Sequence, residues 1–132
     1  MAEITLEEFE ADARAFLEAN AARKDSEKKF VWGEGADKVA VFEEKDREQE
    51  LADVAKACEW RRTKFDAGFG WVTGPTQYGG AGLTNAHERA YLKLESQYEI
   101  PSQGPFTIGL GMVAPTILAH ASDVAKDLYL KK

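Results

Sequence analysis

The sequence predicts an all-α fold, a helical bundle, and three observations lead to that prediction. Apolar residues recur three and four positions apart in successive segments, which is typical of helices that bury one face. Threonine or serine stands where several of these segments begin, as helix N-caps do (Thr5, Thr84 and Ser122). The length of 132 residues, 44% of them hydrophobic, suits a single domain with its own core, which we place at residues 1–132.

The first helix is expected to begin after Thr5 and to run to about Ala22. Thr5 and Glu8 have the spacing of a capping box, and Ile4 and Phe9 occupy the positions of a hydrophobic staple around it. The predicted buried face of this helix is a line of five residues: Leu6, Phe9, Ala13, Phe16 and Leu17.

A second helix is expected to start near Asp46 and to end before Gly68, a glycine suited to the position after a helix. Its predicted buried line consists of Leu51, Val54, Ala55, Cys58 and Phe65. Cys58 is therefore interpreted as a small buried hydrophobe. Residues 23–45 are expected to be irregular, although the apolar residues at 30–32 and 39–42 could form short strands.

Residues 67–84 form a loop that is rich in glycine and aromatic residues. At Gly79 and Gly80 we expect at least one positive φ, where a Cβ atom costs about 1 kcal/mol or more. Thr84 then caps a third helix, which Pro101 ends because helical geometry is disfavoured for the residue before a proline. The apolar line of this third helix is Ala90, Tyr91, Leu94 and Tyr98.

A fourth helix, beginning near Pro105, is apolar on two faces and should be buried from more than one side. One face carries Leu110, Val113, Ala114 and Ile117, and the other carries Phe106, Gly109 and Met112. Pro115 is expected to kink or split it. A last short helix is expected at residues 123–130, so all the predicted elements are helical.

Charge and composition exclude several classes of protein. The net charge of −6 argues against nucleic acid as the main partner. A single cysteine excludes a disulfide scaffold, and no basic, apolar leader opens the chain, so we expect a cytoplasmic protein. Residues 100–122 contain no Asp, Glu, Lys or Arg, but prolines and glycines interrupt them too often for a membrane span.

No catalytic or metal-binding pattern is evident in the sequence. His87 is expected on the surface and His120 at a helix end, and with one cysteine a zinc site has no support. Glu88, Glu95 and Glu99 are interpreted as solvated helix faces, because acid–base catalysis by carboxylates needs burial. The glycine loop lacks the Lys-Ser/Thr ending and the preceding strand of phosphate-binding loops, which favours a structural turn.

Two stretches carry a resemblance to a known family. Residues 68–84 have the order G-x-x-x-x-x-x-P-x-x-Y-G-G-x-G-L-T, and residues 113–122 are followed by Lys126 and Leu128-Tyr129-Leu130. The first pattern resembles the N-terminal domain of acyl-CoA dehydrogenases. The second is more weakly similar to that family's G-[ST]-x-x-x-K turn and Y-L-P segment, with Ala121 in place of the usual glycine. The order of helices also agrees.

The resemblance implies FAD-dependent α,β-dehydrogenation of an acyl-CoA thioester. In that family the first domain is all-helical and helps to wall the acyl-chain cleft, while a middle β-domain and a C-terminal domain bind most of the FAD and supply the glutamate base. It therefore implies FAD and acyl-CoA for a longer parent protein, and neither flavin nor activity for these 132 residues alone. Residues 24–46 are longer than the family's connector, which leaves the class of acyl-CoA open.

The resemblance implies no catalytic residue or metal ligand in this chain, and it places Phe106, Gly109 and Met112 near the acyl pocket of the parent. A core helix would show the same apolar pattern. Two other functions stay open: a free-standing helical interaction module, and a flavin monooxygenase of the same fold. We also expect the isolated chain to self-associate through its uncharged helix, with Met112 in the contact.

Overall fold

The computed structural model describes residues 4–25 and 45–131 of the chain. Its helices are α1 (Leu6–Asn20), α2 (Arg47–Asp66), α3 (Asn85–Glu95), α4 (Ala114–His120) and α5 (Asp123–Tyr129). The shorter elements are the 3-10 turns η1 (Thr76–Tyr78) and η2 (Gly104–Phe106), the π-helical turn η3 (Gly109–Val113), and the strands β1 (Ala22–Arg23) and β2 (Tyr98–Glu99). The all-α prediction is confirmed. The predictions for residues 26–44 lie outside the described residues.

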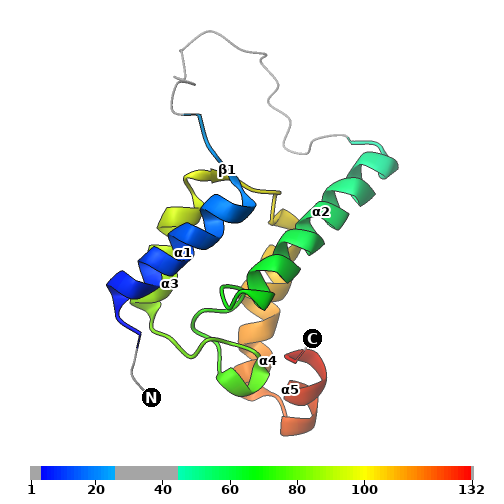
Figure 1. The fold of residues 1–132 in the computed structure, drawn as a ribbon. Helices are drawn as coiled ribbons and strands as arrows, with labels where there is room; N and C mark the ends of the chain where they lie inside the picture. Colours follow the sequence, from blue (N-terminus) through cyan, green and yellow to red (C-terminus); the bar gives the residue numbers. More distant parts are fainter. Residues whose placement is uncertain (1–3, 26–44, 132) are drawn as a thin grey trace, which may run out of the picture.

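A two-residue antiparallel ladder joins the ends of α1 and α3, which lie side by side (Figure 1). Ala22 pairs with Glu99 and Arg23 with Tyr98. The expectation that every element is helical was therefore wrong here, and so was the placement of Tyr98 on the third helix. That helix ends at Glu95. The residues that follow α1 and α3 have no helical hydrogen-bond partners for their backbone N–H and C=O groups, and the ladder pairs these groups with each other.

The helix starts predicted after Thr5, Thr84 and Ser122 are confirmed, but the Thr84 side chain makes no capping hydrogen bond and its hydroxyl instead lies close to His87 Nδ1. Thr5 accepts a hydrogen bond from the Glu8 backbone N–H at 3.2 Å, and the Glu8 carboxylate accepts one from the Thr5 N–H at 3.0 Å. The side chains of Asp46 and Ser122 likewise cap α2 and α5. Gly68, with φ of +88°, follows the end of α2. Its N–H donates to the carbonyl of Phe65, a bond of the Schellman type.

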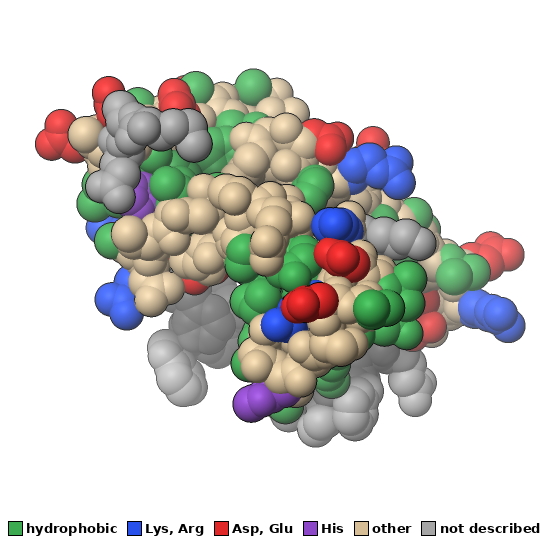
Figure 2. Space-filling view, turned by 90° about the horizontal axis from the view of Figure 1, so that it is seen from below, with side chains coloured by type: hydrophobic (Ala, Val, Ile, Leu, Met, Phe, Trp, Pro, Cys, Tyr) green, Lys and Arg blue, Asp and Glu red, His purple; other side chains and the backbone are tan. Residues whose placement is uncertain are grey.

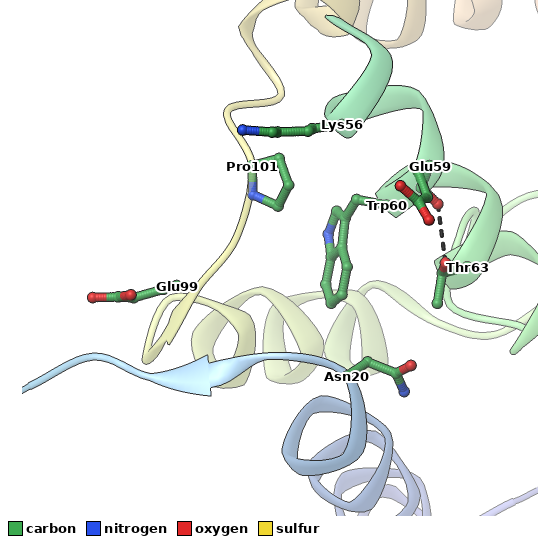
Figure 3. Close-up of a pocket in the computed structure, with 7 residues that line it drawn as sticks. All are labelled: Asn20, Lys56, Glu59, Trp60, Thr63, Glu99 and Pro101. Atoms are coloured by element: carbon green, nitrogen blue, oxygen red, sulfur yellow. Dashed lines mark hydrogen bonds between the residues drawn. The ribbon is translucent and has the colours of Figure 1, made fainter. Parts of the chain in front are cut away.

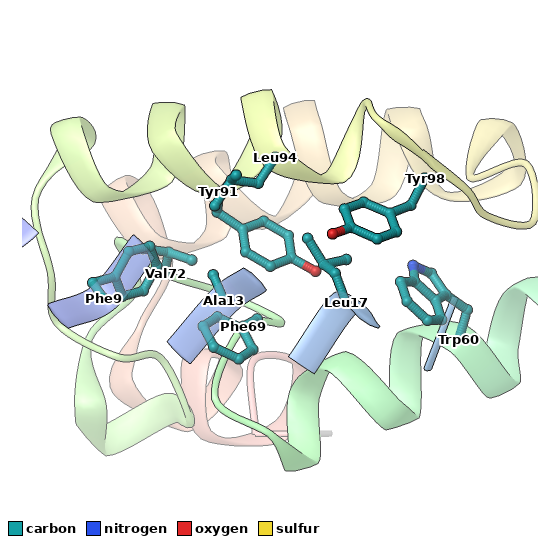
Figure 4. Close-up of a cluster of buried hydrophobic side chains, with 9 residues drawn as sticks. All are labelled: Phe9, Ala13, Leu17, Trp60, Phe69, Val72, Tyr91, Leu94 and Tyr98. Atoms are coloured by element: carbon teal, nitrogen blue, oxygen red, sulfur yellow. The ribbon is translucent and has the colours of Figure 1, made fainter. Parts of the chain in front are cut away.

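The hydrophobic core lies between α1, α3, the end of α2 and the loop that follows it (Figure 4). Tyr91, Leu94 and Tyr98 point from α3 and β2 towards α1, and the aromatic rings of Phe69 and Tyr91 stack with centroids 5.1 Å apart. The buried cluster consists of Phe9, Ala13, Leu17, Trp60, Phe69, Val72, Tyr91, Leu94 and Tyr98. The apolar faces predicted for the first and third helices are thus largely correct.

The predicted buried face of α2 was wrong. Leu51 is 60% exposed and Cys58 is exposed, whereas Ala57, Trp60 and Lys64 are buried. Spacing alone favoured the line through Leu51 and Cys58, but α2 turns its opposite side to the core. That side carries Trp60, which belongs to the hydrophobic core, and Lys64, which forms an ion pair with the buried carboxylate of Glu95.

Residues 107–120 are helical throughout, with the wider π turn of η3 directly before Pro115. The N–H of Ala114 donates to the carbonyl of Gly109, five residues back. Proline lacks the N–H that a regular helix requires, so the wider turn beside it accommodates the irregularity. The disruption expected at Pro115 therefore takes the form of a π turn. α5 matches its predicted range to within one residue.

Candidate functional site

A buried cluster of polar side chains links α2 to α3. The ammonium of Lys64 lies 2.9 Å from Oε1 of Glu95, and both side chains are less than 10% exposed. Trp60 Nε1 and the Tyr91 hydroxyl each donate to the same oxygen at 3.2 Å. Three donors thus converge on one carboxylate oxygen, which compensates for its removal from water.

The cluster changes the titration of its neighbours. Burial, followed by the charge of Glu95 and the hydrogen bond to it, raises the pKa of Tyr91 far above its usual value. Burial also lowers the pKa of the Arg61 guanidinium, against the opposing charge of Glu95. The Tyr91 hydroxyl therefore stays protonated at ordinary pH, which favours a structural cluster over a proton-transfer site.

This cluster was not predicted from the sequence. Glu95 was interpreted as solvated, and that was wrong: it is 6% exposed. A signal was present, because Glu95 stands four residues after Tyr91, and Lys64 four residues after Trp60, so each charge shares a face with a core aromatic residue. The pairing itself joins residues 31 positions apart, which spacing within one helix does not reveal.

The glycine loop is closed on itself by backbone hydrogen bonds. The N–H of Gly80 donates to the carbonyl of Pro75 and that of Gly82 donates to Gly74. Gly79 has φ of +88°, which confirms the expected positive φ, and a Cβ atom on Gly80 would overlap the backbone of Gly74. The loop therefore has a structural role, and these N–H groups are already used, so they do not form a cradle for the phosphates of a flavin.

A cavity of about 420 Å³ lies between α2, this loop, and the helices η3, α4 and α5. Arg61 of α2 and Glu88 of α3 line it on the polar side. The Arg61 guanidinium donates to the carbonyl of Gly70 at 3.0 Å. The other lining residues are Gly70, Trp71, Thr73, Leu110, Gly111, Ala114, Pro115, Tyr129 and Leu130. The face seen from below, where the loop and α5 lie, carries hydrophobic side chains with a few charged side chains among them (Figure 2).

A second, more polar hollow of about 320 Å³ lies beside Trp60 (Figure 3). The indole stands between Pro101 on one side and Glu59 and Thr63 on the other. Thr63 donates to the backbone carbonyl of Glu59. The remaining lining residues are Asn20, Lys56 and Glu99, so this hollow offers no cysteine or histidine and its one hydroxyl is already bonded.

The three residues expected near an acyl pocket lie in η2 and η3. Phe106 is half-buried, Gly109 is exposed, and Met112 is 66% exposed. None of them lines the cavity beside Arg61, which contacts Leu110, Gly111, Ala114 and Pro115 of the same helical stretch instead. The prediction that this helix is buried from more than one side was therefore wrong for the described residues. Met112 points away from them, and so does Ile108, whose side chain is 68% exposed.

The histidines have no catalytic surroundings. The His87 ring is half-buried, not on the surface as expected: Nδ1 lies 2.8 Å from the Thr84 hydroxyl and Nε2 lies 3.3 Å from the carbonyl of Ile4. Its ring meets Phe9 edge-on, so it secures the start of α1. His120 is the exposed last residue of α4, as predicted.

Within residues 4–25 and 45–131, no group of three or more His, Cys, Asp or Glu side chains could hold a metal ion. No helix in the same ranges is both long and apolar enough to cross a membrane.

The chain is similar to part of a known enzyme. No model of a known protein family matches the chain, and no solved structure matches it significantly. Over 127 residues the chain is 26% identical to Acyl-CoA dehydrogenase IpdE1 of Mycobacterium tuberculosis (strain ATCC 25618 / H37Rv). The aligned region covers 96% of this chain and 29% of that protein, so the chain spans less than a third of its relative. Along nearly its whole length, the chain is thus similar to a fragment of an acyl-CoA dehydrogenase.

Proposed function

We propose that residues 1–132 form the N-terminal helical domain of an FAD-dependent acyl-CoA dehydrogenase. The similarity of nearly the whole chain to part of such an enzyme supports this function, as does the glycine-loop pattern of residues 68–84. The catalytic base and the main flavin contacts would then be supplied by parts of the parent beyond these residues. The acidic composition and single cysteine favour a cytoplasmic location.

One structural observation carries the proposed role of this domain in the parent. Met112 and Ile108 are about two-thirds exposed on a helix from the charge-free segment 100–122. Apolar side chains in a charge-free segment suit the wall of an acyl-chain pocket, since such pockets are lined mostly by apolar groups. In the parent, Phe106, Gly109 and Met112 would face the acyl chain, and the other domains would complete the pocket.

Isolation of the protein that contains this chain tests the proposed function. An antibody against residues 1–132 captures it from its natural source, and the absorbance spectrum and the reduction of ferrocenium by acyl-CoA thioesters are then measured. We expect a yellow protein that reduces ferrocenium only with acyl-CoA, while the isolated 132 residues are colourless and inactive. A captured protein without flavin, or turnover by the purified 132 residues, would contradict the proposal.

The same exposed surface has a consequence for the isolated chain. Without the other domains, Ile108, Met112 and Val113 have no cover from the described residues, and large exposed apolar patches are uncommon on monomers. We therefore infer that the isolated chain self-associates through this surface. A free-standing interaction module would behave in the same way, and the capture experiment separates the two because a module carries no flavin.

A further inference from the structure

The cavity beside Arg61 combines an extended apolar wall with one cationic group. Its volume of about 420 Å³ lies within the range of small-molecule sites, roughly 300–1,000 Å³. The apolar wall is formed by Trp71, Leu110, Ala114, Pro115 and Leu130. The π turn of η3 contributes to this wall, and such turns are frequent at functional sites.

The Arg61 guanidinium is incompletely satisfied by the described residues. It has five N–H donors and makes one hydrogen bond, to the carbonyl of Gly70. Glu88 lines the same cavity, but within the described part of the chain it makes no ion pair with Arg61 at 4.0 Å or less. The carboxylate of Glu95 is already held by Lys64.

The charges of Lys64 and Glu95 offset each other in their ion pair. Arg61 and Glu88 are then the two formal charges on the cavity lining, and the structure shows no ion pair between them within the described residues. Arg61 is half-buried, so its guanidinium has lost part of its hydration without gaining an ion-pair partner. An anion entering the cavity would supply that partner.

We propose that this cavity binds an aliphatic monocarboxylate, with its carboxylate on the Arg61 guanidinium and its alkyl chain against Leu110, Ala114 and Pro115. The planar guanidinium presents paired donors that match a carboxylate. The apolar wall disfavours a strongly hydrated inorganic anion. The Glu88 carboxylate, also on the lining, disfavours a second negative charge. The site is separate from the proposed acyl pocket, whose residues do not line this cavity.

Ligand comparison with the full 132-residue chain tests the proposal without flavin or acyl-CoA. Heptanoate, heptan-1-ol and heptylammonium are titrated by calorimetry, and amide shifts are mapped by NMR. We expect heptanoate to bind at least about tenfold more tightly than heptan-1-ol, because a hydrogen bond between two charged groups is stronger than one to a neutral hydroxyl. The largest shifts should fall on residues 70–73, 110–115 and 129–130. Equal binding of the alcohol, or shifts elsewhere, would overturn the proposal.

Two pairs of variants test whether Arg61 binds the carboxylate and whether Ala114 contacts the alkyl chain. R61Q should weaken heptanoate binding at least about tenfold, whereas R62Q, which changes an exposed neighbour, should leave it unchanged. A114L should block the cavity, whereas A119L, at an exposed position of α4, should not. Equal effects within either pair would overturn the proposal. Circular dichroism checks that each variant folds. If R61Q does not fold, the proposal is tested by R61K, by the comparison of the three ligands and by the pair A114L and A119L.

Discussion

Lys64 of α2 and Glu95 of α3 form an ion pair at 2.9 Å, with both side chains almost completely buried. The pair lies beside the stacked rings of Phe69 and Tyr91, and the Lys64 ammonium is 5.1 Å from the centre of the Tyr91 ring. The face of α2 that carries Lys64 also buries Trp60, whereas Leu51 on its other face is 60% exposed.

Replacing Lys64 with Met should destabilise the chain by about 3–5 kcal/mol, because it leaves a buried carboxylate without its counter-charge. The double variant K64M/E95Q should be more stable than K64M, since the neutral amide still accepts hydrogen bonds from Trp60 and Tyr91. Urea unfolding measures both, with K56M as the control at an exposed position of the same helix. A loss for K64M no larger than that for K56M would show that the pair does not hold α2 in place.

Tyr91 should make the fold sensitive to alkaline pH. Burial and the neighbouring Glu95 raise the pKa of Tyr91 in the folded state above its ordinary value of 10.0. The unfolded chain then releases this proton first, so the stability is fully present below about pH 10 and falls as the pH rises above it. Y91F should reduce the slope of unfolding free energy against pH in that range, whereas Y129F, at an exposed tyrosine, should not. Identical slopes for Y91F and the unsubstituted chain would contradict this assignment.

The glycine loop should tolerate no side chain at Gly79 or Gly80. Gly79 has a positive φ with Phe65 packed against it, and Gly80 lies directly on the backbone of Gly74. G79A and G80A should each lower the melting temperature, with a cost of about 1 kcal/mol or more. G109A is the matched control, because a Cβ there meets nothing within 4 Å and alanine favours helix. Thermal unfolding in which both loop variants match G109A would show that the loop is not strained.

The sequence predicted the features that depend on neighbouring residues and missed those that depend on distant ones. The caps at Thr5 and Ser122 act within three residues, so local spacing identified them, and it also placed the start of α2 near Asp46. The face that α2 buries carries Trp60 and Lys64, which both contact Glu95, a carboxylate on another helix. Spacing therefore placed Cys58 inside and Glu95 outside, both wrongly.

Less of the candidate site could be predicted from the sequence. The arginine of the cavity comes from α2, and its apolar wall comes from the glycine loop, η3, α4 and the residue after α5, so only the tertiary fold brings them together. The exposed position of Met112 also depends on which face of that helix packs inward, and both faces are apolar. The glycine-loop pattern, by contrast, was evident because its contacts lie within one segment.

The isolated chain should self-associate through the surface around Met112. M112E should shift the sedimentation coefficient towards the monomer, because a charge in an apolar contact loses hydration without a partner. The side chain is 66% exposed, so the substitution should not unfold the chain. L92E, at an exposed leucine of α3, serves as the control. A chain that sediments as a monomer at high concentration would contradict this inference.

Photolabelling tests the proposed role of this domain most directly. The protein captured from its natural source is irradiated with an acyl-CoA that carries a diazirine in its acyl chain, and the labelled residues are identified by mass spectrometry. We predict labels on the peptide that contains Phe106 and Met112, reduced by unlabelled acyl-CoA in competition. Competed labelling confined to other parts of the protein, with none on residues 106–112, would contradict the proposal that this helix walls the acyl-chain pocket.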